Sequence, residues 1–185
     1  MGFGRRQERR EERREDRGPG GRAGDDGEHR YKMRQKMLSI GDDFWIENGR
    51  GERTFKVDGK ALRVRQTLIF EDRNGNELLK IQERMLRIKD SMEIEDAHGQ
   101  RVALVKKALI TPLRERWSVD IPGGQDLEVQ GNILDHEFHI GNVAEVSKKW
   151  FRIADSYGVE IAPGQNDILI LAVAVVIDMM AHSGR

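Results

Sequence analysis

The sequence predicts a mainly β protein, a closed antiparallel barrel of about twelve strands that encloses one apolar C-terminal α-helix. Every side chain from Ile168 to Ile177 is apolar, so a helix there has no polar face and must be surrounded by other apolar groups. Between residues 31 and 161, short runs alternate apolar and polar side chains and are separated by turn signals such as Asn74-Gly75. This pattern is typical of antiparallel sheet with one buried face. A sheet of that size tends to close, and a large barrel leaves a lumen for the helix.

The first 30 residues are predicted to be a disordered tail rich in arginine and glutamate. They hold nine arginines and eight acidic residues, and their only apolar side chains are Met1, Phe3 and Ala23. Such a segment cannot bury enough apolar surface to fold. The interleaved acids also argue against a nucleic-acid-binding arm. The barrel domain is therefore expected to span residues 31–185.

The strands are predicted from period-two alternation between turn signals. Trp117, Val119 and Ile121, for example, alternate with Arg116 and Ser118, which gives one buried and one wet face. Breaks in alternation at Met85-Leu86 and at residues 108–110 predict bulges. The twelve expected strands are 31–38, 43–48, 52–58, 62–71, 77–83, 85–96, 100–110, 113–121, 126–130, 136–140, 142–150 and 152–161.

The helix is predicted to span residues 166–181, from the N-cap Asn166 to the Ser183-Gly184 stop. A membrane span needs about 20 apolar residues, and the charge of Asp178 makes insertion costly, so a core helix is the better interpretation. Asp178 either has a partner at the mouth of the barrel or is solvated at the helix end. The side chains expected in the core are Ile168, Leu169, Leu171, Val173, Val176 and Ile177.

Four segments resemble the LURP-one-related family of the Tubby C-terminal-like superfamily. They are residues 131–140 (GNILDHEFHI), 144–150 (AEVSKKW), 155–161 (DSYGVEI) and the helix end Val176-Ile177-Asp178. The likeness covers roughly residues 31–181. It implies a twelve-stranded barrel around a central hydrophobic helix. Phospholipid scramblases share the superfamily, and most family members have no established activity.

No catalytic, cofactor or metal site is predicted. The chain has no cysteine, and no phosphate-binding loop or nucleophile elbow is present. His136 and His139 would point to opposite faces of a strand, so we expect two ordinary surface residues and no shared metal. Residues 72–77 resemble the start of an EF-hand loop, but Glu77 stands where glycine is needed; a hairpin turn is expected. The acidic residues around 155–167 are too sparse to predict the calcium segment proposed for scramblases.

The function expected is a non-catalytic binding or scaffold domain, a cytoplasmic monomer that meets anionic phospholipid at the membrane surface. Tubby domains bind head groups through outward Lys and Arg, and the cluster expected here is Lys106, Arg114 and Arg116. Because 32 basic residues balance 32 acidic ones, any positive patch is local and nucleic acid is not an expected partner. Two alternatives stay open: a scramblase-like membrane protein with its C-terminal helix in lipid, and a carrier or enzyme that uses a pocket in the barrel. The sequence names no protein partner.

Overall fold

A computed structural model describes residues 29–34, 43–59, 67–83, 91–111, 114–150 and 156–182, except for the side chains of residues 34, 83, 108–111, 114, 115 and 182. The predicted strand segments at 35–38, 62–66, 85–90 and 152–155, residue 113 of the predicted strand 113–121, and the tail 1–28 lie outside these residues. The elements are β1 (Arg30–Arg34), β2 (Phe44–Asn48), β3 (Arg53–Asp58), β4 (Thr67–Asp72), β5 (Glu77–Glu83), β6 (Ser91–Asp96), β7 (Arg101–Thr111), β8 (Arg114–Asp120), β9 (Leu127–Asn132), β10 (Glu137–Ile140), β11 (Ala144–Ser147), the short 3₁₀ helix η1 (Lys148–Trp150), β12 (Ser156–Ile161) and α3 (Asp167–His182).

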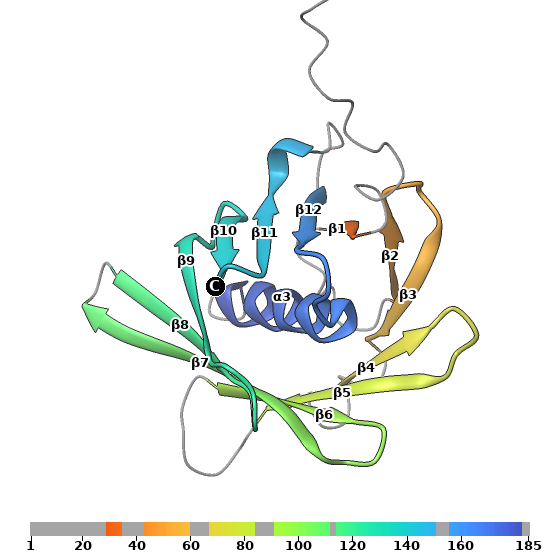
Figure 1. The fold of residues 1–185 in the computed structure, drawn as a ribbon, viewed down its shortest axis with the longest axis horizontal. Coiled ribbons are helices and arrows are strands. Elements are labelled where there is room, and N and C mark those ends of the chain that lie inside the picture. The colour runs from red at the N-terminus through yellow and green to blue at the C-terminus, as the bar shows by residue number, and fades with distance from the viewer. Residues whose placement is uncertain are drawn as a thin grey trace, which may run out of the picture.

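The twelve strands form one closed antiparallel barrel in chain order, and β1 pairs with β12 to close it. Figure 1 shows α3 in the centre with the strands around it. The predicted fold is thereby confirmed, and each described strand overlaps one of the twelve predicted segments. Closure leaves no strand at an open edge among the described residues.

Helix α3 fills the barrel with apolar side chains on all sides. Leu171, Val173, Val176 and Ile177 are fully buried, whereas Ile168 and Leu169, in the first turn, are partly buried and pack against the same core. Asn166 caps the helix, because its Oδ1 accepts a hydrogen bond from the Leu169 N–H at 3.2 Å. In the described part of the chain, no helix has the length and apolar character needed to cross a membrane.

Because the strands are antiparallel and follow chain order, successive connections lie at alternate ends of the barrel. The turns after β2, β4, β6, β8 and β10 lie at the end where α3 begins, which we call the Asp167 end. The β9–β10 turn, η1 and the tip of the β7–β8 hairpin lie where α3 finishes, the Asp178 end. There, β7 and β8 project past their neighbours, at the left of Figure 1.

Three hairpin turns at the Asp167 end are built alike. Asn48, Asp72 and Asp96 stand 24 residues apart, and the side-chain Oδ1 of each accepts hydrogen bonds from the backbone N–H groups two and four residues later. A glycine with positive φ follows three residues after each of them, and a register shift precedes each turn. Residues 72–77 thus form a hairpin, as predicted.

Two details of the strands were predicted with different success. A register shift between Leu109 and Thr111 confirms the bulge predicted at residues 108–110; the bulge predicted at Met85-Leu86 lies outside the described residues. The predicted strand 126–130 ends too early, because Gly131 and Asn132, which carry a turn signal, also belong to β9 and the turn is 133–136. Gly131 has φ 129°, and a Cβ there would lie 2.6 Å from the Phe138 Cα. Gly131 therefore allows β9 and β10 to lie close together and does not form a turn.

Candidate functional site

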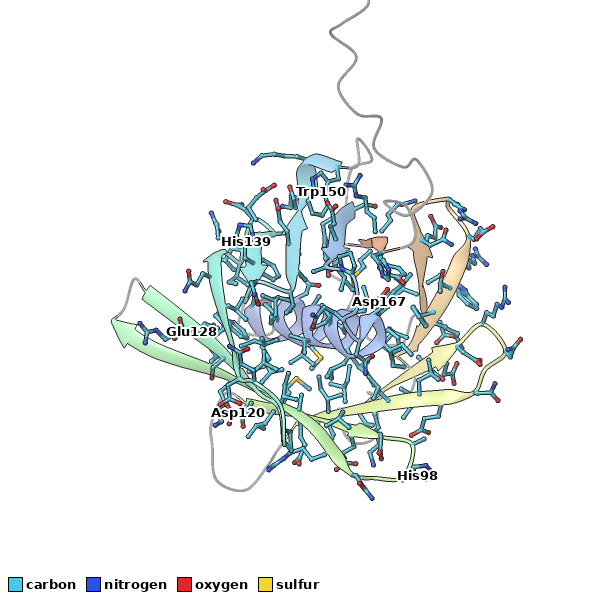
Figure 2. The ribbon with its side chains drawn as sticks, in the orientation of Figure 1. His98, Asp120, Glu128, His139, Trp150 and Asp167 are labelled. Carbon is cyan, nitrogen blue, oxygen red and sulfur yellow. The ribbon has the colours of Figure 1, made fainter. Side chains whose placement is uncertain are left out.

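A polar cluster lies inside the barrel at the Asp178 end. The His136 Nε2 is 2.5 Å from the Asp178 Oδ1, and both side chains are 3% exposed. The imidazole stacks on the ring of Tyr157, with centroids 4.4 Å apart. The prediction that His136 is an ordinary surface residue is wrong, whereas His139 is exposed, on the outer side of β10 (Figure 2). Of the two interpretations of Asp178, a partner at the mouth of the barrel or solvation at the helix end, the structure supports the first.

Local backbone geometry turns His136 inward. The residue ends the β9–β10 turn with φ 53°, a left-handed conformation that is uncommon outside glycine. Its N–H donates to the Ile133 carbonyl at 3.1 Å. From this position the imidazole reaches the helix instead of continuing the alternation of β10. No period-two reading of the sequence could have found this, because the turn interrupts the period.

The interior cluster is suited to holding the helix rather than to catalysis. Burial, and secondarily the charge of Asp178, raise the pKa of Tyr157 well above its ordinary value, which keeps the phenol neutral. A buried carboxylate needs a hydrogen-bonded partner, and His136 supplies one from the β9–β10 turn. Since the three side chains are closed to solvent, the cluster joins α3 to the barrel wall and offers no open site to a substrate.

The opposite end of α3 is tied in a similar way. Asp167 accepts a hydrogen bond from the Tyr31 hydroxyl at 2.6 Å and lies 2.9 Å from the His29 Nδ1. Its carboxylate also faces the positive end of the helix dipole. Figure 2 shows Asp167 between the start of the helix and the strands. Both ends of the apolar helix are thus fixed by polar contacts to strands or turns.

The outer face of β7 and β8 carries the residues predicted to contact lipid. Lys106 and Arg116 point outward, opposite the buried Val105 and Trp117. Lys106 forms an ion pair with Asp120, whereas Arg116 is exposed and has no ion pair or hydrogen bond within the described residues. Arg114 begins β8, paired with Thr111; its side chain lies outside the described residues. The structure therefore brings Lys106 and Arg116 to one surface.

Several other surface charges among the described residues are paired. Lys56 lies 3.0 Å from Asp43 and 3.4 Å from Glu71, and the hydrogen bond to Asp43 is the main cause of its raised pKa. Glu137 accepts hydrogen bonds from Ser147, from the Lys148 N–H and from Lys149. Desolvation acts to raise the pKa of Glu137, but these bonds outweigh it and lower the pKa. Pairs of this kind form a mixed-charge surface around the barrel.

A shallow depression of about 310 Å³ separates the β2–β3 and β4–β5 turns. Arginine side chains and carboxylates line this depression together. One of the carboxylates, Asp72, accepts hydrogen bonds from within its own turn. Hydrogen bonds from Asn76, and then from Asn74, lower the pKa of Asp72. Among the described residues, no group of three or more His, Cys, Asp or Glu side chains could hold a metal ion. The lining residues are Asn48, Glu52, Arg53, Thr54, Asp72, Arg73 and Asn74.

Comparison with known proteins identifies the barrel. The family model described as LURP-one-related matches residues 29–178, which include every strand of the barrel and most of α3. The chain belongs to the LURP-one-related family. Its match ends at Asp178, so the His136–Asp178 pair lies within the region that defines this LURP-one-related domain.

A solved structure shows the same fold. The X-ray structure of a protein from Arabidopsis thaliana aligns with 86% of this LURP-one-related chain and 94% of its own, with a TM-score of 0.58 and 17% sequence identity. At that identity the likeness shows only that the two chains share a fold. This fold is the Tubby C-terminal-like barrel. A comparison with curated proteins finds no match.

Proposed function

We propose that this LURP-one-related domain is a non-catalytic binding module that meets anionic phospholipid surfaces with the outer face of β7 and β8. The observation that carries the proposal is the exposed Arg116, whose guanidinium has no carboxylate partner within the described residues. Lys106 lies on the same face of the hairpin. An unpaired guanidinium can form bidentate hydrogen bonds to a phosphate.

Filling of the barrel by α3 favours an outside surface over an inside pocket. Leu171, Val173 and Ile177 are fully buried against the inner faces of the strands, so the helix occupies the space that a carried ligand would need. A scramblase-like role for α3 would require the helix to leave the barrel and expose that core. These packing relations support binding through the strand exteriors.

The expected affinity is modest. Each Lys or Arg near an anionic membrane contributes about 1 kcal/mol, and the pairing of Lys106 with Asp120 reduces its share. Arg116 and its strand neighbour Arg114 are left as the main contributors, together about 2 kcal/mol, or roughly a 30-fold change in partition. Salt screens this attraction, because the Debye length falls from about 10 Å at 0.1 M ionic strength to about 3 Å at 1 M.

Co-sedimentation of the full-length chain with vesicles of phosphatidylcholine alone, or mixed with phosphatidylserine or a phosphoinositide, tests the proposal. We expect binding only to the acidic vesicles, with loss in high salt and in Arg114→Glu/Arg116→Glu. The matched control is Arg50→Glu/Arg73→Glu, which makes the same charge change on exposed turns at the Asp167 end. Equal recovery on neutral and acidic vesicles, or equal losses in both double variants, would exclude this site.

A further inference from the structure

One exposed leucine stands out on the β9–β10 turn. Among the residues that the structure describes, Leu134 is the exposed large hydrophobic side chain, with 39% of its surface in solvent. Single exposed apolar side chains are common on soluble proteins and say little by themselves. What distinguishes Leu134 is the way in which its turn is held and the charges on either side of it.

The turn is anchored in the core on both sides of Leu134. Ile133 is 7% exposed and His136 is 2% exposed, and His136 is bound to Asp178 of the helix. Asp135 is fixed as well, because its N–H donates to the Asn132 Oδ1 and its carboxylate accepts from the Asn132 Nδ2 at 2.6 Å. Leu134 is therefore presented on a rigid turn whose other side chains are engaged.

Basic side chains flank the turn at the Asp178 end. The neighbouring strand β8 carries the exposed Arg116, and η1, which follows β11, carries Lys148 and Lys149. The Lys149 side chain is 80% exposed, although it also contacts Glu137 at 3.1 Å. Because β8, β9, β10 and β11 are consecutive in the barrel, the turn that carries Leu134 lies between Arg116 on one side and Lys148 and Lys149 on the other.

We propose that Leu134 is a hydrophobic anchor that enters the boundary between head groups and acyl chains when this end of the barrel meets an anionic membrane. The inference rests on the proposed function and adds an apolar contact with the membrane to the electrostatic one. An apolar tip between cations is the arrangement of interfacial membrane-binding segments, which combine buried apolar area with attraction to anionic lipid. The preorganised turn avoids the loss of conformational freedom that a flexible loop suffers on insertion.

A single label can test insertion because the chain has no cysteine. Leu134→Cys, carrying a polarity-sensitive fluorophore, is mixed with phosphatidylserine-containing or pure phosphatidylcholine vesicles, and co-sedimentation is measured on the same samples. We expect a blue shift with the acidic vesicles only. Ala97→Cys, labelled in the same way, is the control, since Ala97 is exposed in the β6–β7 turn at the Asp167 end and should show no shift.

A second, label-free variant separates the apolar contribution from the electrostatic one. Leu134→Ser is expected to weaken binding to acidic vesicles by roughly tenfold, and by a similar factor at low and moderate salt, because burial of apolar surface is not screened. Arg114→Glu/Arg116→Glu, in contrast, should lose most at low salt. Leu134→Ser should keep the wild-type melting temperature, since its side chain is outside the core.

The outcomes distinguish the two proposals. Binding to acidic vesicles without a blue shift at position 134, or with an equal shift at position 97, overturns the anchor. The proposal that the outer face of β7 and β8 binds lipid would be unaffected by that result. Wild-type affinity of Leu134→Ser also overturns it. Absence of binding to every vesicle overturns both the anchor and the lipid-binding function.

Discussion

Removal of the Asp178 carboxylate tests how α3 is fixed in the barrel. In Asp178→Ala, His136 is left inside the core without the carboxylate that lies 2.5 Å from its Nε2. Breaking a buried pair by removing one partner costs about 3–5 kcal/mol. Against this, Asp178 stands near the C-terminus of α3, where loss of a negative charge returns about 0.3–1 kcal/mol. The net destabilisation expected is therefore about 2–5 kcal/mol.

That free energy is measurable by urea denaturation and by thermal melting. For a domain of this size each kcal/mol lowers the melting temperature by about 2–4 °C, so Asp178→Ala should melt roughly 4–20 °C below the wild type. The midpoint in urea should fall without a change in the slope m. Glu128→Ala, which removes an exposed carboxylate on β9 (Figure 2), is the control and should stay within about 0.5 kcal/mol.

A double-mutant cycle identifies the partner. If His136 and Asp178 depend on one another, the double alanine variant should be less destabilised than the sum of the two single variants. Asp178→Asn, which keeps a hydrogen-bonding oxygen, should fall between wild type and Asp178→Ala. A melting temperature of Asp178→Ala equal to that of the wild type would refute the reasoning and mean that the carboxylate is solvated at the helix end.

Three further predictions concern the fold. Gly131→Ala should destabilise far more than Gly99→Ala, because the new Cβ meets the Phe138 Cα at 2.6 Å in the first case and open space in the second; the comparison of urea midpoints checks this. Val173→Asp should abolish soluble expression, since the position is fully buried and an unpaired charge in the core costs several kcal/mol. Tyr157→Phe should flatten the alkaline limb of the pH–stability curve. The raised pKa of Tyr157 means that its contribution is complete below the unfolded-state pKa, about 10, and is lost as the pH rises above it.

Much of the architecture follows from the residues alone. An apolar run without a polar face, such as residues 168–177, has to be enclosed, and alternating strands with one dry face can enclose it. Those two constraints predicted the closed antiparallel barrel and its central helix, whereas the order of the strands came from the structure. The 24-residue spacing of Asn48, Asp72 and Asp96 was also available in the sequence. It shows that three hairpins share one turn design, a signal that reading each turn separately did not use.

The tertiary structure decided which polar residues meet. His136 and Asp178 are 42 residues apart, and only the closure of the barrel around α3 brings the β9–β10 turn to the end of the helix. The inward direction of His136 depends on a left-handed backbone conformation, which alternation does not encode. The ion pair of Lys106 with Asp120, and the absence of an ion partner for Arg116 among the described residues, could not be read from the sequence, since both depend on strand register. Apolar periodicity is a local property of the chain and can be read from it. The pairing of charges depends on contacts across the barrel, which exist only after the chain has folded.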